Sequence, residues 1–442
     1  MLPTLASGTS PLHSTKPLTN YMLALFLLAL YYMWYRYPFQ MGSSGTSPTY
    51  TDTPFSVQLV KYLLFFAIVG SNTFLALLAR GSLPRYPLGQ WMAFVMASYL
   101  VVQSVNLALI TGDQIYILCF LFLFSLVPLL LYPPSFEFSI VSIERCLHWF
   151  VYITTAVFIT EVILFITVGR LPSLAFKGSY SVRFGGLWDD PNSFAVFLSF
   201  ILPFIFFTNF SRPKKVLLLA INLVSLLATQ SLTGIFAFVV SILIVIFCLF
   251  LKPVAIHQAR HIWQFYLSLV LAIIVAFLLL MYLELNHDLI SIATEYWAEK
   301  AGSVGGHMLS LNALMNAGLS TFLGLAPTEF WWGESGYIGI LLNFGVVALV
   351  VFFLIFVAVF GKAIKVLRGN HNKPGIAVFY GIVFFLVDYG VAMFNLPLVR
   401  VFPINLLFIL FAMLVWQTSR ISEWRGVNFR LDNKMGLNFL AH

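Results

Sequence analysis

Charged residues are scarce in this sequence. Asp, Glu, Lys and Arg together make up 9% of the 442 residues, whereas 60% of the residues are hydrophobic. A soluble domain needs a far more polar surface, so the composition excludes one and predicts a polytopic membrane protein. Cysteine is also rare: only Cys119, Cys146 and Cys248 are present, none has metal-site spacing, and no disulfide framework is indicated.

Several motifs of enzyme chemistry are missing as well. The sequence contains no Walker A loop, no GxGxxG after a strand, no HExxH helix and no GxSxG nucleophile elbow. It also has no Asp-x-Asp pair of the kind that holds a metal–nucleotide sugar. We therefore expect no cofactor, no metal site and no nucleotide-dependent reaction.

What the sequence has in quantity is long apolar runs, interrupted by Pro, Gly and charges. They predict about 12 membrane spans of roughly 20 residues each. The spans are expected near residues 20–35, 57–79, 88–110, 115–132, 148–169, 192–210, 216–230, 233–251, 264–284, 336–360, 375–396 and 402–418. Residues 216–251 are one very long run or two short spans, and the polar cluster at 229–234 favours two. The expected fold class is an all-α polytopic membrane protein, with residues 1–442 forming a single integral-membrane domain.

The net charge of +8 is distributed unevenly between the loops. An even number of spans places both termini on the same side, and most of the 24 Lys and Arg fall on that side. They include Arg212, Lys214, Lys215, Lys362 and Lys365. The positive-inside rule makes this side cytoplasmic. The basic charge thus indicates topology and contact with membrane lipids, and it predicts no binding of nucleic acid.

The longest loop, residues 285–335, is expected on the opposite, extracytoplasmic face. Its first part, residues 286–301, places apolar and aromatic side chains on one helical face and acidic ones on the other. Such a helix lies flat in the membrane interface. It either shapes an entry for a lipid-borne molecule or simply anchors the loop.

Arg183 is a candidate phosphate ligand on the same face. The Asp190–Pro191 pair predicts a helix start, to which Asn192 also belongs. The Gly185–Gly186 pair would let the backbone fold Arg183 back over that start. A guanidinium at a helix N-terminus makes a phosphate site. The alternative is an interfacial arginine that holds lipid phosphate nonspecifically.

Glu334 is a candidate general base. It follows Trp331 and Trp332 and precedes the next apolar run. Desolvation beside tryptophan and lipid would push its pKa upward, which suits a base that works near neutral pH. The alternative role is a carboxylate that stabilises the N-terminus of its own helix.

The remaining polar candidates are His307 and three charges inside predicted spans. His307 follows two glycines and begins a possible helix over 307–319, as a catalyst or as a structural hydrogen-bonding group. Lys61, Glu161 and Asp388 are either ion-pair contacts between helices or a proton relay in a transporter.

Three stretches resemble the bacterial O-antigen polymerase and O-antigen ligase superfamily. The first is Arg183, the following glycines and the Asp190–Pro191–Asn192 helix start, and the second is the turn at 229–234. The third is residues 323–326 followed by 333–345, which begins Gly-Glu-Ser-Gly-Tyr. With about 12 spans and a long outer loop late in the chain, the resemblance covers most of the protein.

The resemblance implies a GT-C-type glycosyltransferase in the bacterial inner membrane, inverting and metal-independent. Its donor and acceptor would be undecaprenyl-diphosphate-linked glycans of lipopolysaccharide biosynthesis, and a chain-length regulator would be a further partner. The roles that it implies are catalytic for Arg183, Glu334 and His307 and substrate-binding for Arg400, Asn192, Trp331, Trp332 and Tyr337.

Two departures from the family pattern bear on the reaction. Leu232 stands where the family's turn has an arginine, and Arg400 on the same face could substitute for that cation. A carboxylate, Glu334, stands where ligases use a histidine, which favours a polymerase that joins repeat units. The alternatives are a ligase that transfers glycan to a lipid acceptor, with His307 as base, and a transporter of the same lipid-linked glycan.

Overall fold

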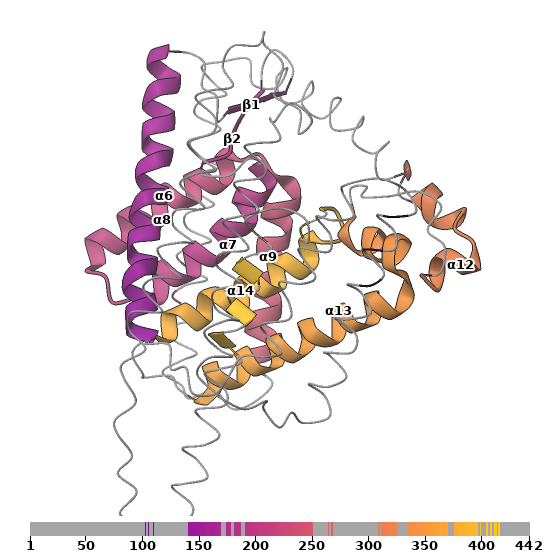
Figure 1. Cartoon of the computed structure of the whole chain (residues 1–442). Coiled ribbons are helices and arrows are strands. Elements are labelled where there is room, and N and C mark those ends of the chain that lie inside the picture. Colours follow the sequence, from indigo (N-terminus) through magenta and orange to yellow (C-terminus); the bar gives the residue numbers. More distant parts are fainter. Residues whose placement is uncertain are drawn as a thin grey trace, which may run out of the picture.

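The computed structural model describes residues 140–168, 174–177, 181–186, 191–250, 311–324, 335–369 and 375–396, together with isolated positions such as Leu398 and Phe408. These residues are almost entirely helical (Figure 1). The helices are α6 (Ile140–Val168), α7 (Pro191–Phe207), α8 (Arg212–Ala228), α9 (Leu232–Phe250), α12 (Leu319–Phe322), α13 (Gly336–Gly369) and α14 (Ile376–Ala392). The expectation of a helical protein is confirmed for this part of the chain, and the other predicted spans lie outside it.

One element departs from the all-helical expectation. Strands β1 (Leu174–Lys177) and β2 (Ser181–Phe184) form a two-stranded antiparallel ribbon between α6 and α7. The sequence of β2, Ser-Val-Arg-Phe, alternates polar and apolar residues, a pattern typical of a short strand. The pairing satisfies backbone hydrogen bonds in the connection between the two helices.

Two described helices are long and apolar enough to cross a membrane: Ile143–Ile163 within α6 and Gly336–Arg368 within α13. Three shorter apolar helices accompany them, at Pro191–Phe207, Leu232–Val245 and Ile376–Ala392. Many large apolar side chains on α6, α8, α9 and α13 are exposed, among them Ile163, Val216, Leu243, Phe247, Leu354 and Val357. Large contiguous apolar surfaces are rare on soluble proteins, so this pattern supports a lipid environment for the bundle.

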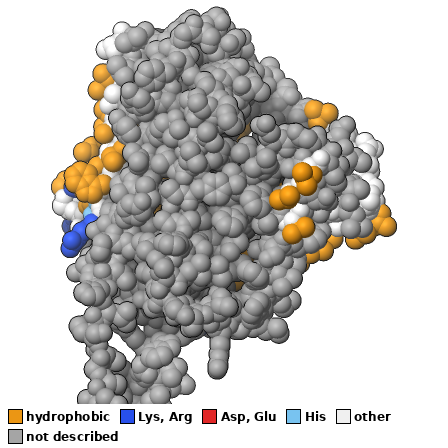
Figure 2. All heavy atoms as spheres, in the orientation of Figure 1, with side chains coloured by type: hydrophobic (Ala, Val, Ile, Leu, Met, Phe, Trp, Pro, Cys, Tyr) orange, Lys and Arg blue, Asp and Glu red, His pale blue; other side chains and the backbone are white. Residues whose placement is uncertain are grey.

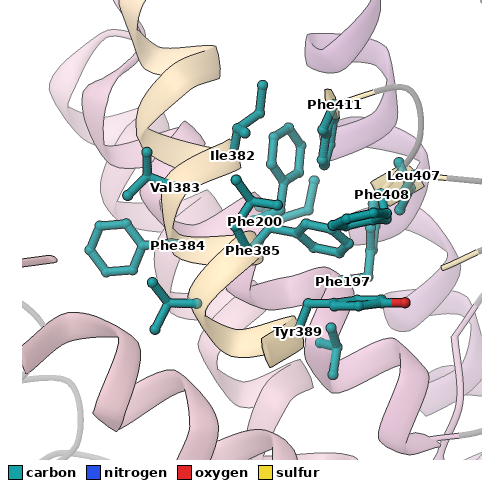
Figure 3. Close-up of a cluster of buried hydrophobic side chains, with 14 of the residues drawn as sticks. Phe197, Phe200, Ile382, Val383, Phe384, Phe385, Tyr389, Leu407, Phe408 and Phe411 are labelled. Carbon is teal, nitrogen blue, oxygen red and sulfur yellow. The ribbon is translucent and has the colours of Figure 1, made fainter. Parts of the chain in front are cut away.

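Helix α14 forms the centre of the bundle. Nearly every residue of α14 is buried, and the helix packs against α7, α9 and α13. Phenylalanines fill the contact, with Phe200 on α7 and Phe385 on α14 both against Phe411 at ring-centroid distances of 4.6 and 5.2 Å (Figure 3). Tyr389 stacks on Phe408 at 5.0 Å in the same cluster. Because lipid tails are as apolar as these rings, close packing stabilises the contact more than exclusion of water does.

The two-span interpretation of residues 216–251 is confirmed as two helices. Helix α8 ends at Ala228 and α9 begins at Leu232. Between them Gln230 has a φ of 49°, a left-handed conformation that reverses the chain. The start of α9 then lies tightly against α7, because a Cβ on Gly234 would stand 2.4 Å from the Ala195 Cβ.

Helix α13 bends near its beginning. Gly345 interrupts the helix with φ 82° and ψ 174°, a conformation almost restricted to glycine. The bend brings Gly345 against the backbone of Leu323 and Gly324, just after α12. It thereby fixes Leu323 and Gly324, which belong to the predicted loop over 285–335, to α13. The predicted helix over 307–319 is only partly formed, since residues 311–315 are helical but the chain breaks at 316–318 before α12.

Candidate functional site

Several described polar residues lie at the end of the bundle where α7, α9 and α13 begin and α14 ends, and Figure 1 shows these helices. We call this the polar end and define it by five residues: Asn192, Ser231, Thr233, Ser335 and Asn395. Hydrogen bonds between the segments hold it together, as described below. All three stretches that carry the family resemblance contribute to it.

The chain that enters α7 folds back on that helix. Arg183 lies on β2, opposite Ala175 in the strand register. Phe184, the next residue, packs edge-on against Phe158 of α6, with the two ring centroids 5.6 Å apart. Gly186 is buried against the ring of Phe194 in the first turn of α7. Gly186 therefore lies against the first turn of α7, while the Arg183 side chain lies outside the described part of the structure, so its predicted place over the helix start stays a prediction.

Helix α7 begins at Pro191, as predicted, and its second residue is joined to the turn before α9. The Ser231 hydroxyl donates to Asn192 Oδ1 at 2.8 Å. The same hydroxyl oxygen accepts a hydrogen bond from the Gly234 backbone N–H at 3.1 Å, so Ser231 is the N-cap of α9. This hydrogen bond joins the start of α7 to the turn at 229–234, although Asn192 and Ser231 are 39 residues apart in the chain.

A second hydrogen bond joins the end of α14 to the start of α9. Asn395 donates through Nδ2 to the Thr233 hydroxyl at 2.5 Å. Sequence analysis did not single out Asn395. The signal was present, because Asn395 is a polar residue two positions before Pro397 at the end of an apolar run, where a helix stops.

The start of α13 is fixed to the same segment. The Gly336 N–H donates to the Met393 carbonyl at 2.9 Å, and the Tyr337 hydroxyl donates to the Gly390 carbonyl at 2.6 Å. Tyr337 is 8% exposed, and its ring contacts those of Phe353 and Phe394 at centroid distances of 5.0 and 4.7 Å. The sequence suggested that Tyr337 packs against substrate. In the structure its hydroxyl and ring are engaged between α13 and α14, so it positions α13.

The electrostatics of the polar end favour an anion. A hydrogen bond joins the N-terminus of α7 to the residue that precedes α9. The first residue of α13 is hydrogen-bonded to the segment that follows α14. Each N-terminus carries about half a positive charge from the helix dipole, although the N–H groups of Gly234 and Gly336 are already bonded within the protein. The C-terminus of α14 opposes them, but Gly336 occupies one of its carbonyls, that of Met393. A phosphate group is the ligand that such an arrangement suits.

Most other predicted site residues lie outside the described part of the chain. These are Glu334, His307, Arg400, Trp331 and Trp332. Their neighbours are described: Ser335, which follows Glu334, is buried at the start of α13, and Asn395 precedes Arg400 by five residues. Within the described ranges, no three His, Cys, Asp or Glu side chains come together as metal ligands.

Two of the predicted intramembrane charges are described, and both are buried. Glu161 lies on α6 and is 3% exposed. Asp388 on α14 is fully buried, and neither of its carboxyl oxygens has a hydrogen-bond partner among the described residues. Ser199 of α7 lies near the Asp388 carboxyl, but its hydroxyl donates to the Val196 carbonyl at 2.6 Å. Lys61 lies outside the described residues.

Comparison with known proteins returns no match to a family model, to a curated protein or to a solved structure.

Proposed function

We propose that this protein is a multi-pass bacterial inner-membrane glycosyltransferase that polymerises undecaprenyl-diphosphate-linked repeat units at the outer face. Both termini would be cytoplasmic, and the polar end with residues 285–335 would face outward. The observation that carries the proposal is the Ser231–Asn192 hydrogen bond, since it joins two of the resembling stretches at the site where three helices begin. The third stretch joins them through the Asn395–Thr233 and Gly336–Met393 hydrogen bonds.

The chemistry follows from the charges that the polar end can supply. The converging N-termini of α7 and α9, with the Arg183 guanidinium, would bind the diphosphate of the donor. Glu334 would take the proton of the acceptor hydroxyl, whose oxygen attacks the anomeric carbon of the donor sugar. The bond from that carbon to the diphosphate oxygen breaks, and the electron pair leaves with the diphosphate. Configuration at the anomeric carbon inverts, because attack and departure occur on opposite sides.

A transporter of the same lipid-linked glycan is the second candidate, and Asp388 favours it. A fully buried carboxyl without a hydrogen-bond partner among the described residues is costly in an apolar helix, and intramembrane charges of this kind mark proton relays in transporters. A ligase remains the alternative within the same superfamily. It would use His307 in place of Glu334 and a lipid acceptor in place of a second repeat unit.

A reconstituted assay separates these functions. Purified protein would be incubated with lipid-diphosphate-linked repeat units, without metal or nucleotide, and the products separated on a gel. A polymerase gives a ladder of lengthened lipid-linked glycans, and Arg183→Ala and Glu334→Gln should each reduce it by about 100-fold or more, as removal of a general base or a charge-stabilising group does.

The controls in that assay decide between the candidates. A ladder that both variants retain at normal protein levels would overturn the site assignment. Transfer only when lipid A core is added would indicate a ligase and direct mutagenesis to His307. Transport of the glycan across vesicles without any glycosidic bond formation would indicate the transporter.

A further inference from the structure

The opposite end of the bundle carries a cluster of basic and aromatic side chains on α6 and α8, which no step of the proposed reaction uses. Figure 2 shows blue Lys and Arg atoms beside orange apolar atoms on this side of the molecule. We call the cluster the basic aromatic patch and define it by six residues: Arg145, Trp149, Tyr152, Phe210, Arg212 and Lys214. Arg145, Trp149 and Tyr152 follow one face of α6 at helical spacing.

Aromatic rings hold Lys214 in place without neutralising it. Its Nζ lies 4.5 Å from the centroid of the Tyr152 ring and 5.2 Å from that of Phe210. A cation above an aromatic face is attracted by the ring but keeps its charge. Lys214 is thus positioned and remains available to an anion.

The neighbouring lysine, Lys215, differs from Lys214 because its ammonium group is bonded within the protein. Lys215 turns inward, where its Nζ donates to the Phe206 carbonyl at the end of α7 at 2.8 Å, and burial lowers its pKa. Lys215 therefore completes the α7–α8 connection, whereas Lys214, one residue earlier, points across the surface.

The three outer cations of the patch have no anionic partner in the described part of the protein. Arg145, Arg212 and Lys214 are all exposed, and none forms an ion pair there. The nearby carboxylate is Glu144, whose Oε1 accepts a hydrogen bond from the Thr208 hydroxyl at 3.1 Å. Three cations against one engaged carboxylate leave an excess of positive charge.

Apolar side chains continue the surface directly below these charges. Trp149 is 64% exposed, and Val216 and Leu217, the next residues along α8, are 66% and 59% exposed. This sequence of charge, aromatic ring and aliphatic side chain matches the sequence of headgroup, interface and acyl chain in one leaflet. A soluble anion would leave the apolar part uncovered.

From this arrangement we infer that the basic aromatic patch is a binding site for an anionic phospholipid of the cytoplasmic leaflet. Arg212 and Lys214 contact its phosphate, and Trp149 and Val216 lie against its acyl chains. The inference requires that the helices cross a membrane, and its assignment to the cytoplasmic leaflet rests on the proposed orientation. Its test does not measure glycan transfer, so it stands or falls separately from the proposed polymerase.

Native mass spectrometry of the full chain in detergent tests the site. Phosphatidylglycerol and phosphatidylcholine with identical acyl chains are the probes, and the number of bound lipids is measured against lipid concentration. Each interfacial cation contributes about a fivefold change in affinity. Arg212→Gln with Lys214→Gln should therefore weaken phosphatidylglycerol binding about 25-fold and leave phosphatidylcholine binding unchanged.

The matched control removes two cations elsewhere on the same predicted side, Lys362→Gln with Lys365→Gln, and should keep phosphatidylglycerol affinity within about twofold of the parent protein. Equal binding of both lipids by the parent protein, or undiminished phosphatidylglycerol binding by the Arg212–Lys214 variant, would overturn the site. Displacement of the lipid by millimolar glycerol 3-phosphate would reduce it to a free-phosphate site and so overturn the lipid assignment.

A folding defect in the double variant is handled by two further measurements. Lys214→Arg keeps the charge and should keep the affinity, whereas Lys214→Gln alone should lose about fivefold. The affinity of the parent protein for phosphatidylglycerol should also fall as salt is raised, because exposed charges are screened. Salt-independent binding would contradict the inference.

Discussion

Asn395 and Thr233 are 162 residues apart in the chain, yet the Asn395 amide donates to the Thr233 hydroxyl at 2.5 Å. This hydrogen bond joins the end of the central helix α14 to the first turn of α9. On the other side of that turn, Ser231 reaches Asn192 on α7. The polar end is therefore one connected hydrogen-bonded structure built from three helices.

Ser231→Ala removes two hydrogen bonds, one to Asn192 and one from the Gly234 N–H that caps α9. We expect a loss of about 1–3 kcal/mol in the free energy of unfolding, together with reduced glycan polymerisation. Thermal unfolding in detergent and the gel ladder measure the two effects. Ser241→Ala is the matched control, because the buried Ser241 hydroxyl donates only within its own helix, to Phe238. Equal losses in both variants would show that Ser231 is an ordinary buried serine.

Gly234→Ala places a methyl group where no space exists. The new Cβ would stand 2.4 Å from the Ala195 Cβ, so α9 must move away from α7. Overpacking of this kind costs about 1–3 kcal/mol, and the shift should also disturb the Ser231–Asn192 contact. Gly361→Ala is the control, since a Cβ there meets nothing within 4 Å and alanine favours a helix. If the melting temperature of the Gly234→Ala variant is as high as that of the Gly361→Ala variant, α7 and α9 do not approach each other as closely as described.

Tyr337→Phe distinguishes a positioning role from a substrate contact. The variant loses the hydroxyl bond to the Gly390 carbonyl but keeps the ring contacts with Phe353 and Phe394. Loss of one buried hydrogen bond should cost about 1 kcal/mol. We expect a lower melting temperature with KM for the lipid-linked donor unchanged. A raised KM at unchanged stability would instead place Tyr337 against substrate.

Asp388→Asn separates the two candidate functions. The side chain is fully buried and unpartnered in the described structure, so a neutral group of the same shape should leave stability equal or higher. Glycan polymerisation should also persist, because Asp388, which lies about one helical turn before the end of α14, has no role in the proposed diphosphate binding or proton transfer. Abolished transport of lipid-linked glycan in this variant, with transport detectable in the parent protein, would favour the transporter.

The sequence by itself determined the helical character, because runs of apolar residues this long have few other stable forms. It also located the break between α8 and α9, since the polar residues 229–234 cannot continue an apolar span. Pro191 marked the start of α7 for a local reason: proline fits the first turn, where its missing N–H is not needed.

Only the tertiary structure decided which segments meet. Apolar periodicity carries no information about partner helices when every face of a helix is apolar, so the central position of α14 and the Asn395–Thr233 hydrogen bond did not follow from the sequence. The same holds for Tyr337, whose aromatic ring suits a substrate contact and a helix contact equally. Close packing at Gly234 and Gly345 selects one arrangement of the helices, because a side chain at either position would collide with its neighbour. The sequence shows that these residues are glycines, but only the assembled structure shows which segment each one contacts.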